Sequence, residues 1–404
     1  MLALTNGVLI DGTENDPVKS ATVLIEGNRI KAAGANVEIP EGSEVIDLKG
    51  KTILPGLIDT HLHAGGTVEM GPGKPAFCGS AGSVDYSDAR ESALKWGITT
   101  WRSGGDYFPD IQETSEKVKA GKLRGPRIFY HGPQIQAVNG HPGSTVWKGD
   151  PETCAAAGRF VTNPDEVRAT VRELAAAGIP YIKIMMCELD IWQYPKKTPR
   201  LSDEIVSACV DEAHKLGCRV TVHCECPRDA LVAVKAGTDS AEHIFTAGGE
   251  PAEVPDELIP LMVKQKTFVA PTLTYTRRLE KSFPQAPPRF ETVRKIIKDM
   301  SDAGVRVVVG TDSGAPYIYF GETAHLEMQE MVALGISPKK ALLGATRYAA
   351  ECLGIEDELG TIEVGKLADI TVVDGNPLDD ISTTMNIAYV IKDGEIIAEH
   401  CLSK

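Results

Sequence analysis

The sequence predicts an α/β fold: a (β/α)₈ TIM barrel with a small β-sandwich domain built from both chain ends. Three observations lead to this prediction. Both ends of the chain contain β-like runs, the region between them alternates strand-like and helix-like segments, and eight such units follow one another there. We expect residues 1–54 and 361–404 to form the sandwich domain and residues 55–360 to form the barrel.

The β-rich ends are indicated by apolar runs that turn residues separate. Near the start, residues 8–10, 21–25 and 45–48 are apolar and are divided by Gly, Asn and Asp. Residues 369–373 and 388–391 repeat this character near the end. Because strands from both ends can pair across one sheet, we expect them to make one satellite domain.

The central region alternates short apolar runs with amphipathic helices, which predicts parallel strands joined by helical crossovers. Asp165 opens one helical pattern that Gly178 ends, and Ser202 caps another that runs to Gly217. The glycine-rich segment 67–84 lacks periodicity and is expected to be a loop over the active face. The predicted barrel strands are residues 57–61, 98–102, 127–131, 181–185, 219–223, 239–243, 267–270 and 306–311.

The composition excludes several partners. The 404 residues carry a formal net charge of -14, and 42% of them are hydrophobic. An acidic chain without Lys/Arg runs repels phosphate, so we expect no nucleic-acid partner and no membrane partner. The first residues lack a signal-peptide pattern, and no run approaches the ~18 apolar residues of a membrane span, so we expect a cytoplasmic protein. The nine cysteines include no CxxC pair, and Cys224 and Cys226 are expected to be ordinary thiols.

Side chains that can bind metal end five of the predicted strands, where a TIM barrel places its reacting groups. His61 and His63 are two apart on an extended strand, so both imidazoles face the same way and can reach one ion. One such pair is weak evidence, because many are ordinary core or surface residues, but four histidines at three strand ends favour a site. The complete set is His61, His63, Lys183, His223, His243 and Asp312.

Lys183 lies in an apolar strand, where an isolated ammonium would be heavily desolvated. Reaction of the neutral amine with carbon dioxide would give a carbamate, an anionic bridge between two cations. A structural ion pair and a Schiff-base lysine are the alternatives, and the neighbouring histidines favour the carbamate. Asp312 follows the last apolar run and precedes a turn, where its carboxylate can bind a metal and take a proton from water.

These residues resemble the motifs of the amidohydrolase superfamily, in the branch of imidazolonepropionase-like and Xaa-Pro dipeptidase-like proteins. The resemblance extends over essentially the whole chain. The motifs that carry it are residues 55–63, 182–184, 222–223, 241–243, 310–313 and 360–370.

The resemblance implies two divalent metal ions, and zinc is the expected metal for such nitrogen and oxygen donors. A hydroxide held between the ions would attack an amide carbonyl, because metal ions lower the pKa of water by several units from about 15.7. Asp312 would then carry the proton to the departing nitrogen. The implied ligands are His61, His63 and Asp312 on one ion, His223 and His243 on the other, and carboxylated Lys183 between them.

Residues outside the ligand set are candidates for binding the substrate. His141 follows the third strand in a segment that resembles the branch's Gly-Gly-His-Gly motif, which implies a donor to the substrate's carbonyl or carboxylate. Glu225 stands where the branch has small residues, and it can face a cationic substrate group or a nearby arginine. Trp192 follows strand four and can form an apolar wall or a lid. His131 has no counterpart and is expected in the core or behind the ligands.

The resemblance leaves the substrate open. Dipeptides or N-acyl amino acids are the first candidates for the small-molecule amide, and a cyclic amide, as in imidazolonepropionases, is the second. A mononuclear deaminase would carry a glutamate three residues after His223, where this chain has Cys226. A metal-free scaffold would lack ligands, and none is missing. The resemblance also implies a homo-oligomer.

Overall fold

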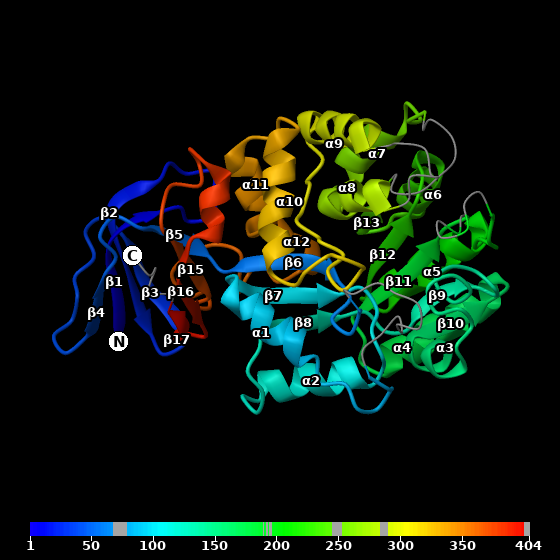
Figure 1. The fold of residues 1–404 in the computed structure, drawn as a ribbon, viewed down its shortest axis with the longest axis horizontal. Helices are drawn as coiled ribbons and strands as arrows, with labels where there is room; N and C mark the ends of the chain where they lie inside the picture. Colours follow the sequence, from blue (N-terminus) through cyan, green and yellow to red (C-terminus); the bar gives the residue numbers. More distant parts are fainter. Residues whose placement is uncertain are drawn as a thin grey trace.

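The computed structural model describes residues 1–67, 79–188, 190, 193, 196–244, 253–282 and 290–399. Figure 1 shows a β-rich end beside a larger α/β body. Within these ranges no helix combines the length and the apolar character needed to cross a membrane. Most of the predicted loop at 67–84 lies outside the described residues.

Strands from both chain ends form one sheet. β5 (Thr52–Pro55) pairs in parallel with β1 (Leu2–Leu9) and antiparallel with β15 (Ile370–Val373). The two β-like ends therefore meet across β5 and β15, as their patterns predict. The sheet also contains β2 (Val18–Glu26), β3 (Arg29–Gly34), β4 (Glu44–Asp47), β16 (Ile387–Lys392) and β17 (Glu395–Glu399).

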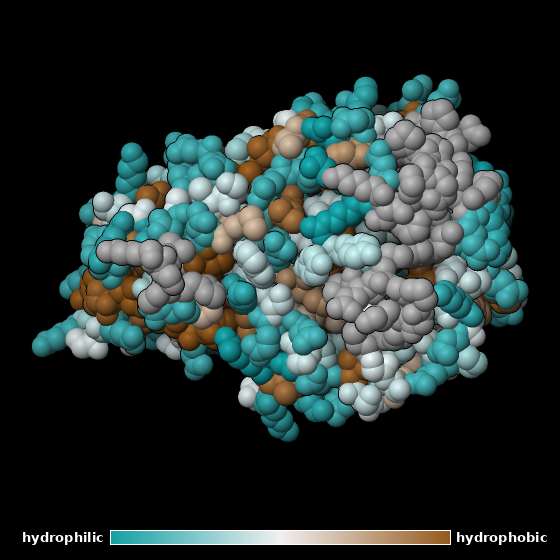
Figure 2. Space-filling model, viewed as in Figure 1, coloured by the Kyte–Doolittle hydropathy of each residue, from teal (hydrophilic) through white to brown (hydrophobic). Residues whose placement is uncertain are grey.

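The β-rich end has an apolar core of its own. Leu4, Ile53 and Val372, from three neighbouring strands, are completely buried in it. Each such side chain stabilises the fold by about 1.5–3 kcal/mol relative to an exposed one. Some apolar surface stays open at this end, including Val45 on β4 and Ile396 on β17, and Figure 2 shows hydrophobic atoms there among mostly hydrophilic ones.

The α/β body contains two parallel sheets. β6 (Leu57–Leu62), β7 (Ile98–Ser103) and β8 (Arg127–Tyr130) form the first, in that order. The second has the strand order β10-β9-β11-β12-β13-β14. Its strands are β9 (Gln134–Ala137), β10 (Gly158–Val161), β11 (Tyr181–Met186), β12 (Arg219–Cys224), β13 (Ser240–His243) and β14 (Phe268–Ala270).

Isolated bridges connect these two sheets with the segment 306–313. One bridge joins β8 to β11, and the segment is bridged to β14 on one side and to β6 on the other. Seven predicted strands are thus found as strands, and the eighth is present only as bridges. Its backbone passes very close to its neighbours at Gly310, where a Cβ atom would lie 2.9 Å from Cβ of Ala270 and 3.0 Å from Cβ of His61.

Two strands of the body were not predicted. β9 and β10 pair in parallel at the edge of the second sheet. Each has only four residues. β9 reads Gln-Ile-Gln-Ala, and all four of its residues are buried although two of them are polar. Short strands with buried polar side chains resemble loops in a sequence.

Helices cover the body, and two of them begin and end where capping signals predict. Asn163 accepts a hydrogen bond of 2.9 Å from an amide in the first turn of α4 (Pro164–Ala176), and Ser202 caps α5 (Asp203–Lys215). Gly178 and Gly217, which follow these helices, adopt positive φ angles of 80 and 75 degrees. The other helices are α1 (Ser87–Lys95), α2 (Asp110–Lys119), α3 (Pro151–Ala157), α6 (Pro227–Ala236), α7 (Leu258–Gln265), α8 (Leu273–Ser282), α9 (Phe290–Ala303), α10 (Glu322–Ala333), α11 (Pro338–Gly344), α12 (Arg347–Leu353) and the 3₁₀ helix η2 (Ile381–Met385).

Candidate metal centre

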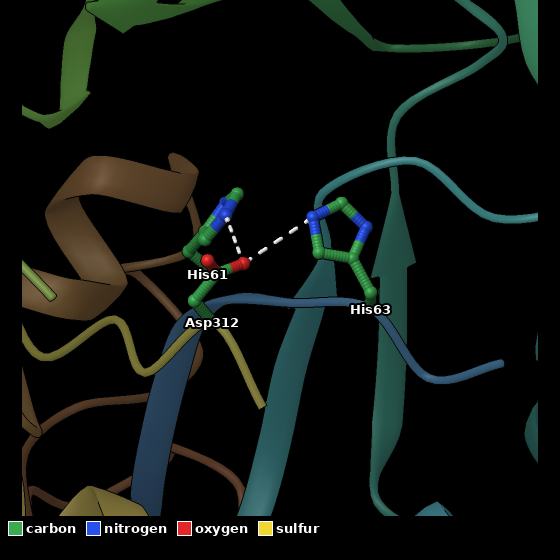
Figure 3. A group of neighbouring side chains, drawn as sticks. All are labelled: His61, His63 and Asp312. Atoms are coloured by element: carbon green, nitrogen blue, oxygen red, sulfur yellow. Dashed lines mark hydrogen bonds and ion pairs between the residues drawn. The ribbon is translucent and has the colours of Figure 1, made fainter. Parts of the chain in front are cut away.

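Three predicted ligands lie together at the strand ends of the body (Figure 3). His61 belongs to β6, His63 follows that strand, and Asp312 comes from the segment 306–313. Oδ1 of Asp312 lies 3.2 Å from Nε2 of His61 and 3.4 Å from Nε2 of His63. Two imidazoles and a carboxylate that converge in this way can hold a divalent cation.

Asp59 fixes the position of Asp312 relative to β6. Its Oδ2 accepts a hydrogen bond of 2.6 Å from the hydroxyl of Thr311, and its Oδ1 accepts backbone amides of Thr311 and His61 at 3.2 Å. Burial raises the pKa of Asp59 to about 7. This buried carboxyl therefore ties the two chain segments that carry the first three donors.

His223 and His243 continue the cluster on neighbouring strands. The ring centroid of His243 lies 4.8 Å from that of His61 and 4.4 Å from that of His223. His141, in the loop after β9, adds a ring 5.0 Å from that of His223. The structure thus brings the predicted histidine ligands and the predicted substrate-binding histidine into one continuous row.

Lys183 lies near these histidines in a buried cluster of titratable groups. Its Nζ atom contacts Oε2 of Glu242, the residue before His243, and only 2% of the lysine side chain is exposed. Oε1 of the same carboxylate lies 3.2 Å from Nη2 of Arg102, which crosses the interior from β7. Burying a lysine, a carboxylate and an arginine together costs free energy, because water no longer solvates these groups. Such buried clusters are typical of functional sites.

In three of the histidines an oxygen atom lies close to Nδ1 of the ring. Nδ1 of His63 lies 3.1 Å from a backbone carbonyl, and Nδ1 of His243 lies 3.1 Å from the hydroxyl of Thr272. Nδ1 of His61 lies 2.8 Å from Oε2 of Glu242. The contacts of His63 and His243 favour the tautomer that carries the proton on Nδ1, in which Nε2 has the lone pair that can bind a metal ion.

Electrostatics favours the neutral forms of these groups. Burial lowers the pKa of His61, His223 and His243 well below the usual value, and the charge of Lys183 acts in the same direction. Burial, followed by the charge of Arg102, also lowers the pKa of Lys183 well below its usual value. Desolvation lowers the pKa of His141 to about 4. Neutral imidazoles are the form that binds metal, and a neutral amine is the form that reacts with carbon dioxide.

The other candidate residues have different surroundings. Glu225 is buried, and its Oε1 lies 3.5 Å from Nε2 of His223. Nδ1 of His131 lies 2.7 Å from the carbonyl oxygen of Ser103, and this buried ring belongs to the core, one of its two expected places. Trp192 lies outside the described residues.

We expect Glu242→Gln to weaken zinc binding by ~10–100-fold, the scale seen when a group that supports a metal ligand is lost. The amide keeps the size of the side chain but removes the charge that faces His61, Lys183 and Arg102. Competition of the protein with a zinc chelator measures the affinity. The control is Glu351→Gln, which removes a carboxylate that is paired with Arg306 away from the cluster. An unchanged zinc affinity in Glu242→Gln would contradict the supporting role.

The α/β body thus carries imidazoles and a carboxylate that could hold a metal ion near the ends of parallel strands, with a buried lysine inside one of these strands. The chain matches the Amidohydrolase family over residues 52–397 and belongs to that family. It is therefore a hydrolase that acts on carbon–nitrogen bonds.

Three relatives match nearly the whole chain. Ochratoxinase of Aspergillus niger is 26% identical over 96% of this chain and 85% of its own length. Imidazolonepropionase of Symbiobacterium thermophilum is 25% identical over 90% of this chain and 85% of its own length. A crystal structure of a Xaa-Pro dipeptidase with bound methionine in the active site is 29% identical, with a TM-score of 0.84, and the match covers 99% of this chain and 100% of that chain. The family and the branch predicted from the motifs are confirmed.

Proposed function

We propose that this amidohydrolase uses two divalent metal ions to hydrolyse the amide bond of a small molecule, with dipeptides and N-acyl amino acids as the first candidates. The observation that carries the proposal is the row of imidazoles around Asp312 and Lys183, of which those of His61, His223 and His243 are buried. The similarity to a Xaa-Pro dipeptidase structure supports the substrate class.

The fold that supports this site is, we infer, a closed (β/α)₈ barrel. The bridges from β8 to β11, and from segment 306–313 to β14 and β6, support closure into a ring of eight segments. Residues 55–360 would form this barrel, and residues 1–54 and 361–404 a β-sandwich domain that braces it. A barrel places the donors at the carboxyl ends of its strands, where its loops can cover a substrate.

The residues present fit two ions. His61, His63 and Asp312 would hold one, His223 and His243 the other, and Lys183, carboxylated by carbon dioxide, would bridge them. The low pKa of the buried Lys183 amine supports this modification, because only a neutral amine forms a carbamate. Nitrogen and oxygen donors favour zinc. When bound, the ions would acidify a water molecule and polarise the scissile carbonyl.

The chain's own groups would move the proton and orient the substrate. Asp312 would accept a proton from water and deliver it to the departing nitrogen. His141, beside His223, would donate a hydrogen bond to the carbonyl or carboxylate of the substrate. Glu225 would face a cationic substrate group, and Trp192 would form an apolar wall.

A cyclic amide is the second candidate, and the similarity to imidazolonepropionase favours it. The same residues would then open a ring rather than divide a linear chain. A deaminase is the weaker reading, because Cys226 stands where that mechanism needs a glutamate.

Incubation of zinc-reconstituted protein with dipeptides, N-acyl amino acids and cyclic amides, in bicarbonate buffer, tests the proposal through the masses of the products. Cleavage of linear members is the expected result, and protein treated with a chelator is the control. Ring opening alone would replace the first substrate class by the second. Equal hydrolysis by the chelated protein would overturn metal dependence.

A further inference from the structure

Three possible metal ligands come from neighbouring strand ends, and the proposed hydrolytic centre uses only one of them, His223. Cys187 follows β11 directly, His223 lies on β12, and Glu225 lies two residues further on. The two strands run parallel, with Met185 opposite His223. Cys187 and Glu225 therefore continue the same end of the sheet, at the level where parallel strands present their reactive side chains.

These donors are close together and shielded from water. A sulfur, a nitrogen and an oxygen atom from Cys187, His223 and Glu225 all lie within 4.8 Å of one another. The relative exposure of the three residues is 2%, 8% and 7%. Cys187 does not take part in a disulfide. Thiolate, imidazole and carboxylate together form a donor set that favours zinc over magnesium or calcium.

We propose that Cys187, His223 and Glu225 form a third cation position, separate from the two expected for the hydrolytic centre, which takes a thiophilic divalent ion such as Zn²⁺. The group does not include His243, whose donor atoms do not share this compact arrangement. The inference rests on the proposed function, because the order of metal binding and the expected inhibition both assume the two-ion centre that shares His223.

The shared ligand gives this position a function. Nε2 of His223 lies 3.5 Å from Oε1 of Glu225. One nitrogen binds one ion, so a cation held at this atom together with Cys187 and Glu225 removes this donor from the second ion of the centre. On binding, a metal–sulfur bond forms and the thiol releases its proton to solvent, without any change in oxidation state. Occupation of the third position therefore inhibits the enzyme, and excess zinc becomes an inhibitor.

Titration of the metal-free protein with Co²⁺ tests the proposal, because a thiolate bound to cobalt produces a charge-transfer absorption band in the near ultraviolet. We expect cobalt to occupy the two centre positions first without this band, and the band to appear as further cobalt binds. Cys187→Ser should lose the band. Cys224→Ser is the matched control, since its buried thiol contacts the carbonyl of Val222 instead. Thermal unfolding shows whether each variant folds.

Zinc inhibition supplies a second readout. Excess Zn²⁺ should inhibit the wild-type and Cys224→Ser enzymes, and Cys187→Ser should resist it. Cobalt binding without a thiolate band at any concentration would overturn the third position and leave the proposed function standing. A band within the first two equivalents would place the thiolate in the centre and also overturn a separate position. Protein that binds no cobalt would overturn both proposals.

Discussion

Asp312→Asn is expected to lower kcat by ~10²–10⁴-fold, the usual contribution of a positioned acid–base group. Asparagine keeps the size of the side chain but cannot accept the proton that we assign to this carboxylate. The substitution also suits the backbone, because Asp312 adopts a positive φ of 59 degrees, which asparagine tolerates. Steady-state kinetics on the substrate identified by product mass measures the effect.

The matched control is Asp299→Asn, which removes a surface carboxylate paired with Lys295. We expect no change in kcat for this variant and similar melting temperatures for both proteins, because exposed ion pairs contribute only about 0–1 kcal/mol. Zinc content should be measured alongside, since Asp312 is also a proposed ligand. Wild-type turnover in a zinc-loaded Asp312→Asn enzyme would remove the proton-transfer role.

Lys183→Ala is expected to cause a second large loss, of ~10²–10³-fold or more in kcat, the scale seen when one preorganised electrostatic group is removed. The variant loses the proposed bridge and leaves space beside Glu242. A small carboxylate such as acetate or propionate fits the chemistry of the lost carbamate, so we expect added propionate to restore part of the activity. Metal content and kcat, each with and without propionate, measure the effect.

The modification itself can be observed in the wild-type protein. When ¹³C-bicarbonate is added to the wild-type protein, we expect a carbamate carbon signal to appear in the NMR spectrum. Lys183→Ala should lack this signal. Lys235→Ala, which removes an exposed lysine paired with Glu257, should keep both signal and activity. A fully active wild-type enzyme without the carbamate signal would remove the bridge from the mechanism.

The donors could be predicted from the sequence because each one carries a local signal. His61 and His63 show the spacing of a strand, and Lys183 is conspicuous as a charge within an apolar run. The structure places His61 beside His63, Oε2 of Glu242 contacts both His61 and Lys183, and the family match supports the motifs that contain them. Local sequence is informative here because parallel strands place their carboxyl ends on the same side of the fold, independently of the conformation of the loops.

The network behind the donors could not be predicted in the same way. Arg102 and Glu242 meet through an ion pair of 3.2 Å, but 140 residues separate them in the chain. Arg102 lies in a predicted strand that also contains two threonines, and no motif says which carboxylate it contacts. The sequence shows Glu242 only as the residue before His243 and does not indicate which side chains it contacts. Such partners depend on how strands are ordered, which the pattern of one strand does not encode.

The pairing of β5 with β15 has a consequence for synthesis on the ribosome. β5 leaves the ribosome before the whole α/β body, and its antiparallel partner follows only after that body. During translation, at about 5–20 residues per second, the edge of β5 therefore stays open while the body folds. An open strand edge is a template for pairing with other chains. The nascent protein is thus open to aggregation at this edge until β15 emerges. Pairing with β15 then covers the edge of β5 and joins early and late parts of the chain.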